Sequence, residues 1–180
     1  KIGHKSLVSS HKDDILNASK IILPGVGSFD RAIQNINQLK LKESLDYVAL
    51  TKKVPVLGIC LGMQLMTSES EEGNLQGLGW IKGECKKFEF TSLRIPHMGW
   101  NYVKVNANVD LTDKMDNNYK FYFVHSYYVS LHDKTNTILS TNYGIDFCSA
   151  YKYGNIFGVQ FHPEKSHKFG MQLLTNFINI

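Results

Sequence analysis

The 180-residue sequence lacks the features that mark several large classes of protein. Its three cysteines are an odd number with no Cys-x-x-Cys spacing, which argues against a disulfide framework or a zinc ribbon. No apolar run approaches the ~20 residues that span a bilayer, and no signal peptide is visible. The net charge of +4 comes from scattered lysines rather than a basic block. We therefore expect a cytoplasmic globular domain with no membrane, nucleic-acid, metal or cofactor partner.

What the sequence does contain, in its first half, is an alternation of apolar runs and helical patterns. Strands are expected at residues 5–9, at 20–23 and from Val54 onward. Helices are expected over roughly 11–17, from Phe29 to about residue 39 with Ser28 as N-cap, and over 41–51. This order predicts an α/β fold with parallel strands joined by crossover helices.

The second half is richer in strands. Residues 101–105, 120–124, 137–140 and 147–151 alternate or run apolar between turns, and we expect mostly antiparallel pairing there. A further strand over 156–162 precedes a closing helix with Phe169, Leu173 and Phe177 on one face. Residues 1–180 are thus predicted to form one α/β domain with an antiparallel extension.

Cys60 stands between two glycines where a buried strand stops and a helix is expected to start. In this Gly-Ile-Cys-Leu-Gly sequence, Gly58 and Gly62 would allow the close-packed turn of a nucleophile elbow. The N–H groups of the helix start would lower the thiol pKa, which makes Cys60 a candidate thiolate. A tight turn around a small buried thiol fits the same pattern.

His162 and Glu164 follow the last predicted strand. Pro163 between them is taken to exclude a helix, and in an extended backbone both side chains point the same way. Glu164 would then orient the imidazole, and such a pair beside a thiol generates a thiolate and later protonates a leaving amine. A structural histidine is the alternative, and a metal site with Cys60 lacks a second ligand motif.

The Pro-Gly-Val-Gly turn at 24–27 also follows a strand. A backbone N–H at Val26 or Gly27, with that of Leu61, would bind an oxyanion formed when Cys60 attacks a carbonyl. A plain glycine-rich turn is the alternative.

Together these segments resemble the class I (triad) glutamine amidotransferases, whose three landmarks match residues 24–29, 58–64 and 158–164 in order. Within that family, residues 96–101, 123–128 and 162–166 are most similar to glutaminase subunits of imidazole glycerol phosphate synthases. The resemblance covers nearly the whole chain. It implies a flavodoxin-like open, mostly parallel sheet flanked by helices. It also implies a Cys60-His162-Glu164 triad that hydrolyses L-glutamine to glutamate and ammonia.

The resemblance further implies which residues bind glutamine. They match Gly27, Gln64, Glu72, His125, Ser126 and Tyr127. Glu72 would meet the ammonium group of glutamine, although the acidic run that contains it also suits a solvated face. His125, Ser126 and Tyr127 suit an ordinary strand equally well.

A partner is implied as well. His97, Met98, Trp100 and Asn101 match the region that lies toward a HisF-like cyclase subunit, which would take up the ammonia in a heterodimer. Trp100 also suits a core or rim position. The family's usual first strand and Asp-Tyr-Gly-x-Gly-Asn turn are absent, and residues 1–4 are interpreted as the tail of a missing first helix.

Three other functions remain open. One is a paralogous glutaminase that feeds ammonia to a sugar-modifying enzyme of surface polysaccharide synthesis. Another is a non-catalytic binding module of the same fold. A thiol hydrolase or peptidase on a similar α/β fold is the third.

Overall fold

The computed structural model describes residues 3–180 and contains a nine-stranded sheet with a separate two-stranded pair. The helices are α1 (Lys12–Asn17), α2 (Phe29–Gln38), α3 (Lys42–Asp46), α4 (Leu61–Leu65) and α5 (His167–Asn179). The strands are β1 (Ile21–Leu23), β2 (Val56–Ile59), β3 (Glu69–Ser70), β4 (Gly83–Lys87), β5 (His97–Tyr102), β6 (Lys104–Val105), β7 (Lys120–His125), β8 (Tyr127–Leu131), β9 (Thr137–Tyr143), β10 (Ile145–Tyr153) and β11 (Ile156–Val159).

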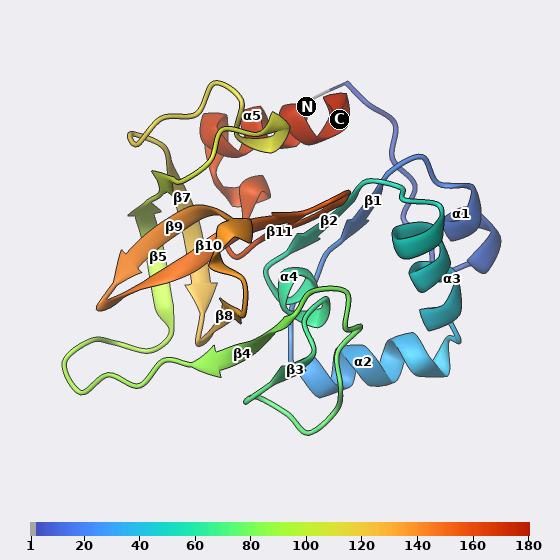
Figure 1. The fold of residues 1–180 in the computed structure, drawn as a ribbon, viewed down its shortest axis with the longest axis horizontal. Helices are drawn as coiled ribbons and strands as arrows, with labels where there is room; N and C mark the ends of the chain where they lie inside the picture. Colours follow the sequence, from blue (N-terminus) through green and yellow to red (C-terminus); the bar gives the residue numbers. More distant parts are fainter. Residues whose placement is uncertain (1–2) are drawn as a thin grey trace.

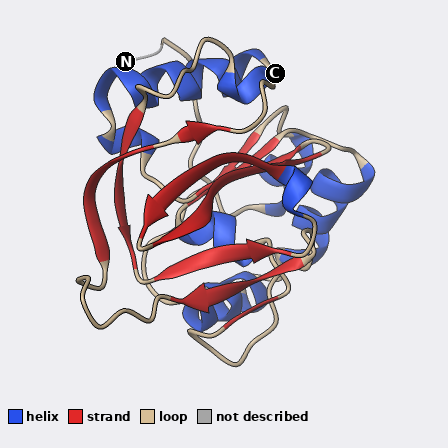
Figure 2. Cartoon of the chain, turned by 60° about the vertical axis from the view of Figure 1, so that its left-hand side comes forward, coloured by secondary structure: helices blue, strands red, loops and turns tan. Residues whose placement is uncertain are grey.

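At one end of the sheet, β1, β2 and β11 are parallel with β2 in the middle, and at the other end the short β3 pairs in parallel with β4. Every residue of β2 and β11 is buried, as expected for parallel strands covered by helices on both faces. Val56 packs into a cluster with residues of α2, α3 and α4, whereas its neighbour Leu57 packs into a second cluster with Leu173 and Phe177 of α5. Figures 1 and 2 show these helices on opposite sides of the strands.

The antiparallel part continues from β11. Strand β10 pairs with β11, β9 and β8, and β8 pairs with β4. Strands β5 and β7 form the separate antiparallel pair, in which His97 lies opposite His125. The predicted α/β class, with parallel strands between helices and an antiparallel extension, is confirmed.

Several local predictions differ from the structure. Residues 5–9 form no strand, and Leu7 and Val8 are 75% and 98% exposed with no neighbouring strand to cover them. Strands β3, β4 and β8 were not predicted, and the helix expected over 41–51 is α3 followed by a π-helical turn, Tyr47–Thr51. Of the helix tail expected at 1–4, residues 1 and 2 lie outside the described residues, and Gly3 and His4 are not helical.

None of the helices within residues 3–180 has the length and apolarity needed to cross a membrane.

Candidate active site

Cys60 occupies a sharp turn between the end of β2 and the start of α4. Its backbone lies at φ +52° and ψ −108°, a region that non-glycine residues rarely adopt. The Cys60 N–H donates to the carbonyl oxygen of Val159 at 2.8 Å, which ties the turn to the neighbouring strand β11. Strained backbone of this kind persists only where the surroundings impose it, and it is concentrated at functional sites.

The glycines on either side of Cys60 are required by close packing. A Cβ atom on Gly62 would overlap the backbone oxygen of Leu23 in β1. On Gly58 it would come within 2.6 Å of the Gly62 oxygen. Gly25 of the preceding turn is equally restricted, because a Cβ there would lie 2.7 Å from that of Leu61. The predicted need for glycine at 58 and 62 is confirmed.

The Cys60 thiol does not have the lowered pKa that the helix start predicts. Burial raises its pKa from 9.0 to about 11, although hydrogen bonds from the Leu61 backbone and the Gln160 side chain act in the opposite direction. Desolvation outweighs these donors because the thiolate loses its hydration inside the protein. The free thiol therefore needs a base to become a nucleophile.

His162 and Glu164 form the expected pair. Glu164 Oε1 lies 2.7 Å from His162 Nδ1, and the imidazole is buried while the carboxylate side chain is 52% exposed. The backbone differs from the prediction, because Pro163–Lys165 is a 3₁₀ turn rather than an extended segment. Proline is accepted at the first position of such a turn, where its missing N–H has no intrahelical partner.

Strand β7 fixes the position of His162. The His162 N–H donates to the Tyr122 oxygen at 2.9 Å, and the Ser166 hydroxyl donates to the His162 oxygen at 2.6 Å. Ser166 Oγ in turn accepts the Tyr122 N–H at 3.0 Å. Tyr122 of β7 thus fixes the backbone of His162, whose side chain lines the same cavity as Cys60.

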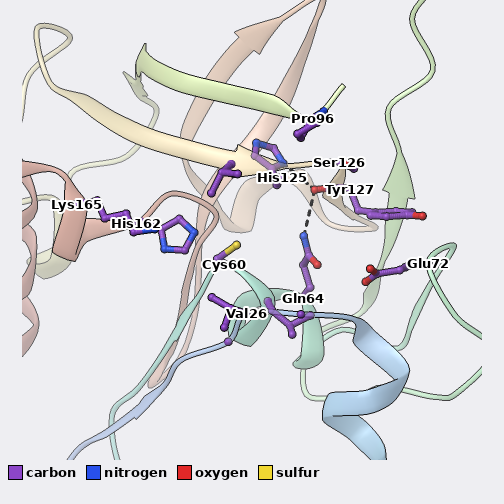
Figure 3. A pocket seen from close by; sticks show the side chains of 14 residues that line it. Val26, Cys60, Gln64, Glu72, Pro96, His125, Ser126, Tyr127, His162 and Lys165 are labelled. Carbon is purple, nitrogen blue, oxygen red and sulfur yellow. Dashed lines mark hydrogen bonds between the residues drawn. The ribbon is translucent and has the colours of Figure 1, made fainter. Parts of the chain in front are cut away.

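These groups open onto one cavity of about 380 Å³ (Figure 3). The predicted residues that line it are Val26, Gly27, Cys60, Leu61, Gln64, Glu72, His125, Ser126, Tyr127 and His162. Glu164 does not line the cavity and acts on it only through His162. Segments at residues 24–27, 58–64, 125–127 and 162 are therefore brought together as the sequence predicts.

Glu72 belongs to the cavity and not to a solvated acidic face. Glu69 and Glu71 are exposed, whereas Glu72 is partly buried, and its Oε2 accepts the N–H of Phe29 at 2.9 Å. Ser28, the expected N-cap of α2, makes no such side-chain bond. Glu72 therefore caps α2 and brings a carboxylate to the cavity.

Gln64 and His125 are more constrained than the sequence indicates. The Gln64 Nε2 group donates to the Tyr127 oxygen at 3.1 Å and to Gln160 Oε1 at 3.0 Å, so both amide hydrogens are used and its oxygen remains for a ligand. Both ring nitrogens of His125 are also paired, with the Tyr127 oxygen and with His97. His125 therefore contributes its ring surface and its hold on Tyr127 rather than a free donor.

Sequence reasoning missed Gln160, Lys165 and Pro96. Gln160 is fully buried, and its Nε2 lies 3.7 Å from Cys60 Sγ. Lys165 and Pro96 line the cavity. The signal for Gln160 was its place in the last strand segment, two residues before His162.

The residues expected to face a partner divide into two groups. Met98 is 61% exposed and Trp100 43% exposed on β5, and the Trp100 ring stacks on His167 at 5.6 Å. His97 is buried instead, because it alternates with Met98 along the strand and points inward. Asn101 is partly buried and bonds to His97. The prediction of a direct partner contact by His97 is therefore wrong.

Comparison with known proteins decides the family. The family model described as "Glutamine amidotransferase class-I" matches residues 4–180. The chain belongs to the class I glutamine amidotransferases.

Curated members of this glutamine amidotransferase family match over nearly the whole chain. The imidazole glycerol phosphate synthase subunit HisH 2 of Methanococcus maripaludis is 51% identical over 179 residues, which are 99% of this chain and 89% of that protein. HisH 2 of Pseudomonas aeruginosa is 44% identical, over 100% of this chain and 90% of that protein.

Solved structures of glutamine amidotransferases share the fold. One structure titled "glutamine amidotransferase" has a TM-score of 0.75 at 14% identity, covering 99% of this chain and 87% of that one. Another, from Thermotoga maritima, has a TM-score of 0.66 at 16% identity, covering 89% and 76%.

Proposed function

We propose that this chain is the glutaminase subunit of an imidazole glycerol phosphate synthase, and that Cys60, His162 and Glu164 are its catalytic residues. The observation that carries the proposal is that Cys60 and His162 line one cavity, with Glu164 bonded to His162 from outside it. Relatives named as subunits of that synthase, at 44–51% identity over the full chain, support the choice of acceptor pathway.

The first chemical step is attack of the Cys60 sulfur on the side-chain amide carbon of glutamine. Because burial raises the thiol pKa to about 11, His162 must take the thiol proton as the bond to carbon forms. The carbonyl electrons move to oxygen, and backbone N–H groups at Leu61 and at Val26 or Gly27, which line the cavity, would stabilise that oxyanion. Glu164 stabilises the imidazolium and keeps His162 oriented.

The remaining steps return the enzyme to its starting state. His162 gives the proton to the amide nitrogen as the carbon–nitrogen bond breaks, which releases ammonia and leaves a thioester on Cys60. Water then attacks the thioester with His162 as base, the carbon–sulfur bond breaks, and His162 returns the proton to the departing sulfur, which yields glutamate and the Cys60 thiol.

Substrate specificity follows from polar groups at the cavity wall. The Gln64 oxygen and the Glu72 carboxylate are acceptors suited to the ammonium group of glutamine. The Tyr127 and Ser126 segment forms the opposite wall. These acceptors suit a substrate with a free α-ammonium group, as glutamine has.

The partner is proposed to be a HisF-like cyclase subunit that binds the face carrying Met98 and Trp100. An exposed Trp on a strand edge is a typical anchor for a protein partner. We expect low glutaminase turnover in the isolated chain and a large rise in the complex, because ammonia released without an acceptor is lost.

The test is glutamate release from glutamine, measured for the chain alone, with a cyclase subunit, and with that subunit plus its ribonucleotide substrate. Stimulation together with glutamine-dependent formation of the imidazole product supports the proposal. Full activity of the chain alone, or stimulation only by a sugar-modifying enzyme, contradicts the assignment of the acceptor. Unchanged glutamate release by Cys60→Ala would contradict the catalytic assignment.

A further inference from the structure

A continuous series of hydrogen bonds links β5 to the reactive sulfur. We call it the imidazole–amide chain and define it as Asn101, His97, His125, the Tyr127 carbonyl, Gln64, Gln160 and Cys60 Sγ. It begins on the strand that carries Met98 and Trp100 and ends at the nucleophile. The proposed chemistry uses neither His97 nor Gln160.

The direction of each bond follows from the Tyr127 carbonyl, which can only accept. His125 Nδ1 lies 2.8 Å from it and must carry the hydrogen. Burial lowers the pKa of His125 to about 3, so the ring is neutral and its Nε2 holds a lone pair. His97 Nδ1 lies 2.9 Å from that lone pair and must donate to it.

The same reasoning gives the direction of the bond between His97 and Asn101, at the β5 end of the imidazole–amide chain. Burial lowers the pKa of His97 to about 4, so its Nε2 is an acceptor and takes a hydrogen from Asn101 Nδ2 at 3.2 Å. Asn101 is itself oriented, because its oxygen accepts the Tyr102 N–H at 2.8 Å and its nitrogen also donates to the Asn142 oxygen. Both histidines are therefore held as Nδ1–H tautomers.

On the other side of the Tyr127 carbonyl, the amides are fixed in the same way. Gln64 uses its two hydrogens on the Tyr127 oxygen and on Gln160 Oε1, which leaves the Gln160 nitrogen to face Cys60 Sγ at 3.7 Å. This donor is one of the groups that lower the thiol pKa against the effect of burial.

We propose that His97 and His125 are positioning residues: they hold the Tyr127 carbonyl and, through Gln64, the Gln160 donor at the Cys60 sulfur. Without the His97 donor, the buried Nε2 lone pair of His125 has no partner, and the ring lowers that penalty only by turning toward another donor. The turned ring weakens the bond from its Nδ1–H to the Tyr127 oxygen, and the acceptor that orients Gln64 is displaced. The inference deepens the proposed glutaminase function and rests on it for the consequence in catalysis.

Core filling is the competing role for His97, since its ring stacks between Phe123 at 4.8 Å and Tyr143 at 4.1 Å. His97→Phe keeps a stacking ring and removes the hydrogen bonds. His97→Asn loses the ring but offers an amide donor in the place of Nδ1. Tyr143→Phe is the matched control, because it keeps the stack and removes a bond outside the imidazole–amide chain, to the Arg94 oxygen.

The first measurement is ¹H–¹⁵N spectroscopy of the wild-type imidazole rings at neutral pH. We expect protonated Nδ1 and unprotonated Nε2 for both His97 and His125. A protonated Nε2 on His125 overturns the proposal, and this result does not depend on any variant folding or on glutamine being the substrate.

The second measurement is the rate of Cys60 alkylation by iodoacetamide, with the glutamine KM determined in the complex with the cyclase. In His97→Phe, loss of one buried donor is expected to raise KM roughly tenfold and to slow alkylation several-fold. His97→Asn should restore part of both values, and Tyr143→Phe should change neither. Equal values for His97→Phe and wild type overturn the proposal. If wild type hydrolyses no glutamine, the proposed function fails, while the tautomers and the alkylation rates still decide this inference.

Discussion

The two walls of the cavity at Cys60 differ in how far apart in the sequence their residues lie. On one wall, Cys60 and Leu61 follow β2 directly, and glycines within two residues of Cys60 set the shape of the turn. On the other, His125 and Tyr127 depend on His97, 28 residues away, and on Gln64, 63 residues away. One wall is specified by local sterics and the other by strand pairing and buried hydrogen bonds. Substitutions in the first wall should therefore act through local packing, whereas substitutions in the second should act through distant hydrogen bonds.

The largest effect is expected from Cys60→Ala, which removes the reacting atom and leaves the turn intact. Glutamine hydrolysis in the complex should fall by at least about 10⁴-fold, as for removal of other catalytic nucleophiles. The free energy of unfolding should change far less than the activity. Glutamate release and urea unfolding measured on one preparation check both statements, and residual activity above a tenth of wild type would refute the assignment.

The next largest effect is expected from Gly62→Ala, which tests whether local steric contacts specify the turn around Cys60. Gly62→Ala places a methyl group against the Leu23 oxygen, which belongs to the backbone of β1 and has little room to move. We expect a loss of about 3 kcal/mol or more in the free energy of unfolding.

Gly154→Ala is the matched control for that substitution. Gly154 has a φ of +58°, but a methyl group added there would meet nothing within 4 Å, so only the backbone term of about 1 kcal/mol applies. Similar losses in the two variants would show that the elbow is not tightly packed. Urea unfolding provides the comparison.

A smaller effect is expected outside the cavity, in Glu164→Gln, because Glu164 acts on the cavity only through His162. The amide keeps the size of the side chain but presents no charge to His162 Nδ1, so the imidazolium is less stable. Because the Glu164 side chain is half exposed, we expect about a hundredfold loss of kcat, less than the ~10⁴-fold known for a buried carboxylate. An unchanged glutamine KM separates this effect from loss of binding.

The smallest effect is expected in the pH dependence of stability, where the thiol of Cys60 is compared with the core thiols of Cys85 and Cys148. Burial raises the pKa of Cys60 to about 11 and that of Cys85 and Cys148 to about 12. The folded chain thus keeps these protons to higher pH than the unfolded chain, whose thiols titrate near 9. The contribution of these thiols to the free energy of unfolding should be constant below pH 9 and fall above it, by about 1 kcal/mol per pH unit for each thiol.

Urea unfolding between pH 8 and 10 measures this decline. Cys148→Ala should reduce the slope without changing glutamine hydrolysis, since Cys148 lies in the core of β10. A slope equal to that of wild type would show that the buried thiol does not contribute.

The difference between the two walls also explains which features of the site could be predicted from the sequence and which could not. The elbow, the His162–Glu164 pair and the glycine turn at 24–27 are visible because a few adjacent residues determine each of them. The raised pKa of Cys60 is not visible, because it depends on burial by distant residues. His97 illustrates the same limit, since its inward orientation follows from pairing with β7.

Errors in the fold have a similar origin. Residues 5–9 have a strand-like composition, but no partner strand is present beside them, and β-propensity has little effect without cross-strand packing. Strand β8 was missed because its tyrosines and polar residues do not alternate cleanly, and its pairing with β4 and β10 determines its structure. The long, periodic segment of α2 was predicted nearly to its ends, and the apolar face from Phe169 to Phe177 predicted the presence of α5.

The central claim, that Cys60 is the nucleophile of a glutamine site, is tested most directly by labelling. An electrophilic glutamine analogue is incubated with the complex, and the modified peptide is identified by mass spectrometry. We predict stoichiometric labelling of Cys60, blocked by excess glutamine and absent in Cys60→Ala, with Cys85 and Cys148 unmodified. Labelling of another residue, or labelling of Cys60 that glutamine does not block, would contradict the account.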